Sequence, residues 1–232
     1  MADSCYNCGA PATTSEHAPP ECFFPEGYNT GLLEVPSCAA HNLRLSTDVE
    51  YARNIICQQW GTNLVSYRVA ETARASFEHS PKLFNRTFES VQPIQVAGEE
   101  TGSFRLDMPR VNKVIKAIAF AMYYHDFGKR NEGDFDIFST SLYSQSTLYH
   151  GIPDSYENLR GRLSNVPFKS MAVPQPKVFK YGMARLDEGR IIYRFEFYEA
   201  FVVFALTLPH RLNRLLYLPV TSDLTIFRLG QE

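Results

Sequence analysis

Four sulfur and nitrogen donors near the N-terminus have the spacing of a metal site. Cys5 and Cys8 form one pair separated by two residues, and Cys38 and His41 form a second pair with the same spacing. A tight turn of this kind points two donors at one tetrahedral ion, and two such turns complete a closed structural zinc site. We therefore predict a structural Zn²⁺ bound by these four side chains. The alternative, unrelated thiols in loops, fits a single pair better than two matched pairs.

Three polar residues lie between these two pairs of predicted zinc ligands or directly after them. Glu16 and His17 fall between the two pairs, and Asn42 directly follows the last predicted zinc ligand. A neutral histidine can accept a proton near pH 7. Carboxylate and amide oxygens suit hard cations such as Mg²⁺. We predict that His17 is a general base, and that Glu16 and Asn42 bind a catalytic Mg²⁺ or Mn²⁺.

Phosphodiester hydrolysis would use these residue types together. It needs a nucleophilic water, a proton acceptor, and positive charge beside the leaving oxygen. Adjacent residues of an extended strand point to opposite faces, so Glu16 can meet an ion while His17 addresses the water. The predicted zinc would bring Asn42 back toward that strand through its neighbour His41. The alternative for Glu16 and His17 is a polar loop above a purely structural zinc site.

The segment resembles the HNH nucleases, the ββα-metal family. The residues that carry the resemblance are "SEHAPP" and "LLEVPSCAAHNLRLSTDVEYA", and they cover residues 5 to about 53. The chain is similar to a little-characterised group of bacterial HNH proteins with an "EH-PP…F-P…VPSC…HN…S-DVEY" signature. The resemblance implies a treble-clef-like zinc module and a metal-dependent endonuclease that cuts DNA, in bacterial defence or a mobile element.

The sequence departs from the family pattern in two places. Glu16 stands where the family more often has Asp, and the histidine that follows the family's Asn is absent. Asp48 or Glu50 is the candidate for that missing ligand, although acidic residues also stabilise the first turn of a helix. One such centre cuts one strand, so cutting both strands would require a homodimer or two successive nicks.

Composition limits the class of protein and its partners. Of the 232 residues, 44% are hydrophobic and 13% aromatic, which is typical of a globular chain. The net charge is −2 and residues 1–43 contain no Lys or Arg, so any surface for nucleic acid must be local. We expect a nucleic-acid partner, DNA rather than RNA. Candidate phosphate contacts, alternatively a solvated helix face, are Arg110, Lys113, Lys116, Lys129 and Arg130.

Cysteine usage and hydropathy give an expected compartment. Four of the five cysteines lie in the first 38 residues, which favours metal ligation in a reducing compartment over a disulfide framework. We find no secretory signal and no apolar run long enough to cross a bilayer, so we expect a cytoplasmic protein without a membrane partner. Cys57 belongs to a helical core stripe, whereas Cys22 is a possible replacement for one zinc ligand.

The elements that must position these residues indicate an α+β fold. We predict an HNH zinc and catalytic module over residues 1–60, a helical region over 61–132, and a β-rich accessory region with antiparallel hairpins over 133–232. Within them, the pattern predicts a helix from Ser46, further helix over 62–90, a loop over 93–103, and a long helix from 108 that stops at Gly128. A hairpin turn is expected at Asp187–Glu188–Gly189, and His125 and Asp126 read as a structural pair.

Three functions compete on this reading. The leading one is a metal-dependent HNH endonuclease acting on DNA. The second is a non-catalytic, zinc-stabilised module that binds nucleic acid or another protein. The third is a nuclease that acts on RNA.

Overall fold

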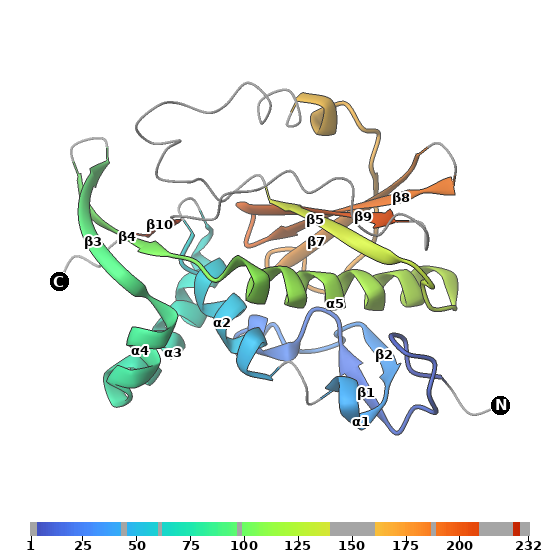
Figure 1. The fold of residues 1–232 in the computed structure, drawn as a ribbon, viewed down its shortest axis with the longest axis horizontal. Coiled ribbons are helices and arrows are strands. Elements are labelled where there is room, and N and C mark those ends of the chain that lie inside the picture. The colour runs from blue at the N-terminus through green and yellow to red at the C-terminus, as the bar shows by residue number, and fades with distance from the viewer. Residues whose placement is uncertain are drawn as a thin grey trace.

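A computed structural model describes residues 4–42, 46–59, 62–96, 99–139, 161–186, 189–208 and 225–227. The fold is α+β with antiparallel sheets, as the sequence predicts. The long helix α5 (Met108–Phe127) lies between a five-stranded sheet and the N-terminal residues (Figure 1). Among the described residues, no helix is both long and apolar enough to span a membrane.

The five-stranded sheet has the order β5-β9-β8-β7-β6. Its strands are β5 (Asp134–Ser139), β6 (Lys169–Ser170), β7 (Phe179–Arg185), β8 (Ile191–Phe197) and β9 (Phe201–Leu208). Pairing of Arg185 with Ile191 confirms the predicted hairpin, while turn residues 187–188 lie outside the described residues. From Tyr193 to Phe197, burial alternates along β8 as polar and aromatic residues alternate, since successive side chains point to opposite faces.

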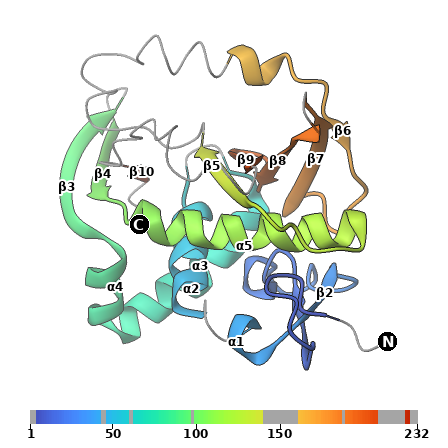
Figure 2. The same ribbon diagram turned by 45° about the vertical axis from the view of Figure 1, so that its right-hand side comes forward.

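The prediction of a loop over residues 93–103 is wrong. This stretch forms most of a hairpin between β3 (Glu89–Val96) and β4 (Glu99–Arg105), which β10 (Thr225–Phe227) extends on the other side of β4. Pro93 suggested a loop because proline cannot donate to a strand ladder, but β3 is an edge strand, where proline is tolerated. The hairpin stands at the opposite end of α5 from the N-terminal strands (Figures 1 and 2).

The predicted helices are present, with caps that explain their ends. They are α2 (Ser46–Ile56), α3 (Leu64–His79), α4 (Pro81–Thr87) and α5. Asn63 caps α3 through hydrogen bonds from the N–H groups of Val65 and Ser66. Gly128 ends α5 with a φ of 64°, a left-handed conformation that glycine adopts readily, so the predicted stop is confirmed.

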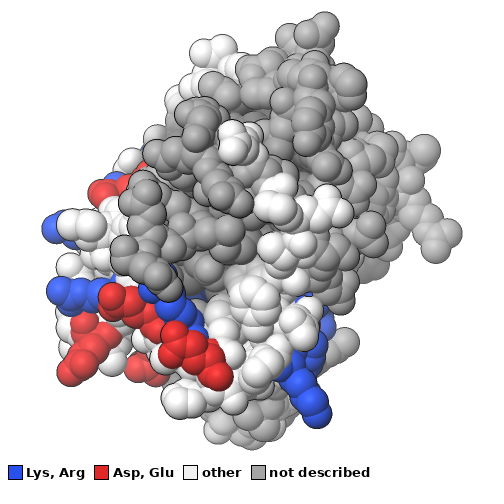
Figure 3. Space-filling model, turned by 90° about the vertical axis from the view of Figure 1, so that its left-hand side faces the viewer, with Lys and Arg blue, Asp and Glu red and all other residues white. Residues whose placement is uncertain are grey.

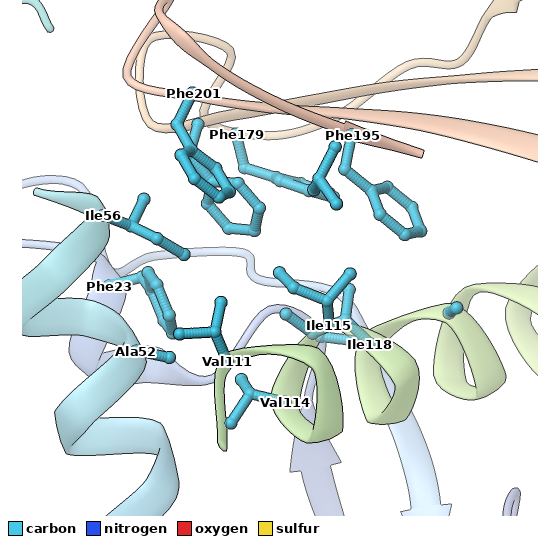
Figure 4. Close-up of a cluster of buried hydrophobic side chains, with 14 of the residues drawn as sticks. Phe23, Ala52, Ile56, Val111, Val114, Ile115, Ile118, Phe179, Phe195 and Phe201 are labelled. Atoms are coloured by element: carbon cyan, nitrogen blue, oxygen red, sulfur yellow. The ribbon is translucent and has the colours of Figure 1, made fainter. Parts of the chain in front are cut away.

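The main core lies between α2, α5 and the five-stranded sheet (Figure 4). Phe179, Phe195 and Phe201 point from the sheet toward Val111, Ile115 and Ile118 of α5. Burying a side chain of this size stabilises the fold by about 1.5–3 kcal/mol. The same core also contains Phe23 and Val35 from the N-terminal residues. It therefore draws on all three predicted ranges (1–60, 61–132 and 133–232), whose boundaries stay predictions.

Candidate functional site

The N-terminal residues form a small strand pair around two tight turns. β1 (Thr14–His17) pairs antiparallel with β2 (Glu34–Ser37), and the short helix α1 (Ala39–Asn42) follows directly. In the first turn, the Cys5 N–H donates to the carbonyl of Ala10, and Gly9 has a φ of 76° that closes the turn. In the second turn, the N–H groups of His41 and Asn42 both donate to the carbonyl of Cys38.

The two turns bring the four predicted zinc ligands together. The ligand atoms of Cys5, Cys8, Cys38 and His41 lie within 4.8 Å of one another. The Sγ atoms of Cys8 and Cys38 are 3.8 Å apart, and His41 Nδ1 lies 3.2 Å from Cys38 Sγ and 3.7 Å from Cys5 Sγ. A tetrahedral zinc with ordinary bond lengths needs separations of about 3.8 Å between sulfurs and about 3.6 Å between sulfur and nitrogen. The cluster therefore could hold a metal such as zinc.

The remaining cysteines lie outside this cluster, which answers the alternative left open for Cys22. Neither Cys22 nor Cys57 belongs to the group of donors that the structure brings together among its described residues. Cys22 is exposed, and Cys57 is buried in the core as predicted. Burial raises the pKa of the Cys57 thiol to about 12, which keeps it protonated and suited to a packing role.

Glu16 is tied to the first turn of the metal cluster. Its Oε2 accepts a hydrogen bond from the hydroxyl of Tyr6, at an O···O distance of 3.0 Å. Tyr6 lies between Cys5 and Cys8, and its ring is almost completely buried. Burial raises the pKa of Glu16, although the hydrogen bond from Tyr6 acts in the opposite direction. The position of Tyr6 between two predicted ligands places it beside the cluster, but the sequence contains no signal for its contact with Glu16.

His17 faces two carboxylates that the sequence analysis did not assign to it. Its Nε2 lies 3.2 Å from Glu34 Oε1, and its Nδ1 lies 3.8 Å from Glu21 Oε2. The first contact follows from the strand register, because His17 is directly opposite Glu34 in the β1–β2 pair. A prediction of that register from the two strands would have placed Glu34 beside His17. Hydrogen bonds from Ser15 and His17 lower the pKa of Glu34, which keeps it ionised.

Asn42 returns to β1, as the sequence analysis expects. Its Nδ2 donates to the backbone carbonyl of Ser15, the residue before Glu16, at 3.0 Å. The second turn of the metal cluster is therefore attached directly to the strand that carries Glu16 and His17. Glu16 and His17 also line one small pocket, walled on its far side by Val114, Ile118 and other apolar residues of α5. The role of Asn42 as a metal ligand stays a prediction.

Asp48, one of the two candidates for the missing ligand, is held by the long helix instead. Its Oδ1 accepts a hydrogen bond from Arg110 Nε at 2.9 Å, and its Oδ2 accepts one from Lys113 Nζ at 2.6 Å. Burial alone would raise the pKa of Asp48, but these two cations outweigh it and lower the pKa. The geometry thus gives Asp48 a structural role between α2 and α5. Glu50 lies 3.9 Å from Arg53 on its own helix.

The five basic residues considered as phosphate contacts fall into two groups. Arg110 and Lys113 bind Asp48, and Lys116 binds Asp134 at 2.9 Å, so these three hold α5 to its neighbours. Lys129 and Arg130 follow the end of α5 and are exposed. Asp126, by contrast, accepts hydrogen bonds from the hydroxyls of Tyr181 and Tyr193, which agrees with its predicted structural role.

Comparisons with known proteins add no relative to this geometry. No family model matches the chain, no curated protein matches it, and no solved structure matches it. The assignment of function therefore depends on the residues and contacts described above.

Proposed function

We propose that this protein is a metal-dependent endonuclease of the HNH type that hydrolyses phosphodiester bonds of DNA. One observation carries the proposal: the Cys3His cluster attaches Asn42 to the same strand that presents Glu16 and His17. The chain order of two paired strands followed by a helix around that cluster supports the ββα-metal arrangement. A role in bacterial defence or a mobile element belongs to the same proposal.

His17 is the group that removes the proton of the attacking water. Its contact with Glu34 orients the ring, as the carboxylate beside a catalytic histidine does in other hydrolases. The 3.2 Å separation also holds the ring against rotation before substrate binds. Glu34 is accordingly a positioning residue that acts through His17.

Glu16 and the carbonyl oxygen of Asn42 would bind a divalent Mg²⁺ or Mn²⁺. Their donor atoms are the oxygen types that such hard cations prefer. When bound, the ion would supply positive charge beside the phosphate and the leaving 3′ oxygen. Tyr6 holds one oxygen of Glu16 toward the metal cluster, which leaves the other oxygen for the ion. The apolar wall from α5 limits water around these residues and strengthens their electrostatic contacts.

The test is cleavage of supercoiled plasmid DNA with added Mg²⁺ or Mn²⁺, in parallel with single-stranded RNA. We expect wild-type protein to nick the plasmid and His17→Ala to lose at least about 100-fold in rate, as removal of a general base does. The matched control is His125→Ala, since His125 is exposed on α5 far along the chain from the site. Both variants should keep the wild-type zinc content and melting temperature.

Two outcomes would reject parts of this proposal. Cleavage that persists in His17→Ala would remove His17 from the reaction. Absence of cleavage on any nucleic acid with either ion would favour the non-catalytic binding module. One observation favours that alternative. Glu16 is hydrogen-bonded to Tyr6 and His17 faces two carboxylates, so both side chains already have partners within the protein. Cleavage confined to RNA would select the third function.

A further inference from the structure

Tyr6 connects the first turn of the metal cluster to one candidate ligand of the catalytic ion. It lies between Cys5 and Cys8 in the sequence, and its hydroxyl donates to Oε2 of Glu16 at 3.0 Å. This hydrogen bond engages one oxygen of the carboxylate and leaves the other, Oε1, free of it. The two oxygens of Glu16 are therefore not equivalent toward a metal ion.

The position of the Tyr6 hydroxyl is fixed by the backbone and by burial. The Tyr6 N–H donates to the carbonyl of Pro36 in β2 at 2.9 Å. Pro36 is directly opposite Ser15, the residue before Glu16, in the β1–β2 pair. The Tyr6 side chain is only 1% exposed, so close packing restricts its ring. The hydroxyl is therefore held beside the strand that carries Glu16 and cannot follow a carboxylate that turns away.

The surroundings of this hydrogen bond make it unfavourable to break. Tyr6 and Glu16 line the same small pocket, whose other wall includes Val114 and Ile118 of α5. If Glu16 turned both oxygens toward an ion, the Tyr6 hydroxyl would lose this partner beside an apolar wall. A buried donor without a partner destabilises the fold, so we expect the bond to persist when an ion binds.

The number of carboxylate oxygens that reach an ion influences which ion binds. Mg²⁺ requires nearly ideal octahedral geometry, keeps several water molecules and needs few protein oxygens. Ca²⁺ is larger, takes about six to eight oxygens in flexible geometry and commonly uses both oxygens of one carboxylate. A glutamate with one oxygen held by a tyrosine offers a single oxygen. Such a ligand suits Mg²⁺ and withholds from Ca²⁺ the second oxygen that it would use.

We propose that Tyr6 is a positioning residue that limits Glu16 to one metal-binding oxygen and thereby favours Mg²⁺ over Ca²⁺ at the candidate site. The inference rests on the ion site of the proposed nuclease. Tyr6 acts through Glu16 and does not itself contact the ion or the substrate. With Asn42 held by the second turn, both turns of the metal cluster then place a ligand of the catalytic ion. Partners of this kind, which hold a ligand rather than the ion, commonly tune metal affinity.

The experiment measures ion binding separately from cleavage. Zinc-loaded protein is titrated with Mn²⁺, whose free concentration is read by electron paramagnetic resonance. Mg²⁺ and Ca²⁺ then displace the bound Mn²⁺, which gives a Kd for each ion. The variant is Tyr6→Phe, which keeps the ring and removes the hydroxyl. The matched control is Tyr181→Phe, which removes a hydroxyl that donates to the carboxylate of Asp126 at 2.8 Å.

Weak binding of Mn²⁺ to surface carboxylates must be subtracted. Viewed from the side of β3 and α4, for example, described Asp and Glu side chains lie at the surface beside Lys and Arg (Figure 3). Glu16→Gln removes the carboxylate of the candidate site and keeps these surface groups. The Mn²⁺ that binds wild type but not Glu16→Gln is therefore the ion at the candidate site.

We expect Tyr6→Phe to shift the ratio of the Ca²⁺ and Mg²⁺ dissociation constants about tenfold in favour of Ca²⁺, because Oε2 of Glu16 becomes available. Tyr181→Phe should leave this ratio within about twofold of wild type. A general loss of stability in Tyr6→Phe would weaken the binding of both ions together and would cancel in the ratio. Zinc content and melting temperature verify that each variant is folded.

The outcomes for this inference and for the nuclease are distinguishable. A wild-type ratio in Tyr6→Phe, or an equal shift in Tyr181→Phe, would overturn the role of Tyr6 and leave plasmid cleavage by the wild type unaffected. A shifted ratio in Tyr6→Phe together with no cleavage of any nucleic acid would overturn the nuclease and support the role of Tyr6. Mn²⁺ binding that is the same in wild type and Glu16→Gln would overturn the ion site and this inference with it.

Discussion

Residues 4–42 and the five-stranded sheet are ordered by different interactions. In the sheet, β8 and β9 bury a row of large aromatic side chains, among them Tyr193, Phe195, Phe197 and Phe201. The N-terminal residues add side chains such as Phe23 and Val35 to the same core, but they also contain a Cys3His cluster and directed hydrogen bonds such as those of Tyr6 and Asn42. Tyr198, at the end of β8, joins the two regions by donating to the carbonyl of Phe23 at 2.6 Å.

The two kinds of interaction have different consequences: apolar burial stabilises the fold, whereas directed contacts set the positions of particular polar atoms. Apolar burial is non-directional, so an aromatic sheet stabilises the chain without fixing any one polar group. Metal ligation and short hydrogen bonds fix particular atoms, which is what the role proposed for Glu16, His17 and Asn42 would require. The comparison predicts that loss of the metal cluster disturbs residues 4–42 more than the sheet, and that polar changes near the site affect activity more than stability.

The largest effect should come from breaking the metal cluster. The Sγ atom of Cys38 lies close to the ligand atoms of both Cys8 and His41. Because Cys38→Ala removes this ligand, we expect the zinc content to fall from one ion per chain to none. Because residues 4–42 lack a core of their own, hydrogen exchange there should accelerate, while exchange in β7, β8 and β9 stays slow. Elemental analysis and hydrogen exchange by mass spectrometry measure the two effects.

The matched control for this variant is Cys22→Ala. Cys22 is an exposed cysteine of the same segment that does not belong to the cluster. It should keep one zinc per chain and wild-type exchange. Loss of zinc from the Cys22 variant, or a Cys38 variant that keeps its zinc, would contradict the ligand set.

The next largest effect should come from a cavity-forming substitution in the core of the five-stranded sheet, measured as a loss of stability. Phe195 is fully buried and contacts Phe179 and Tyr193, so Phe195→Ala should lower the free energy of unfolding by about 3–5 kcal/mol. Phe195→Leu keeps most of the volume and should cost less than about 2 kcal/mol. Denaturant titration gives both values. Zinc bound per folded chain should not change; if it falls with stability, the two regions are not independent.

Sequence patterns predicted the parts of this fold that local chemistry determines. The spacing of Cys5, Cys8, Cys38 and His41 was sufficient to predict their cluster, because two tight turns leave little freedom in where donors point. Gly128 as the stop of α5 was equally local. The prediction at Pro93 was wrong because proline is tolerated only in edge strands, and the sequence does not show which strand is at an edge. The order of this sheet depends on β10, which pairs with β4 from more than 100 residues away.

The contacts that tune the candidate site could not be predicted from local pattern. Tyr6 and Glu34 reach Glu16 and His17 only through the fold of the turn and the register of β1 with β2. A shift of one residue in that register would put Glu34 on the opposite face from His17. In the same way, the sequence made Asp48 a candidate metal ligand at the start of a helix. Only the packing of α2 on α5 brings Arg110 and Lys113 to its carboxylate.

A smaller effect on stability is expected from Asp48, which lies outside both compared regions. Its side chain is 14% exposed and binds two cations, so Asp48→Asn should lower the free energy of unfolding by about 2 kcal/mol at pH 7. The pKa of Asp48 is lower in the folded chain than its ordinary value of 3.8. Its contribution is therefore present above that value and is lost as the pH falls through the folded pKa.

The sign of this pH dependence is the sharper test. The difference in stability between wild type and Asp48→Asn should be constant above about pH 5 and should shrink as the pH falls below about 4. Denaturant titrations across this range measure it. A difference that grows on acidification would contradict the ion pair.

The smallest expected effect tests whether polar contacts near the site act on chemistry alone. Glu34→Gln keeps a hydrogen-bond acceptor opposite His17 but removes its charge, so the plasmid cleavage rate should fall about tenfold while the melting temperature stays unchanged. Glu26→Gln makes the same chemical change at an exposed position of the same segment and should leave the cleavage rate unchanged. An unchanged cleavage rate in Glu34→Gln would contradict the positioning role of Glu34. A lower melting temperature would show that this contact contributes to stability as well as to the placement of His17.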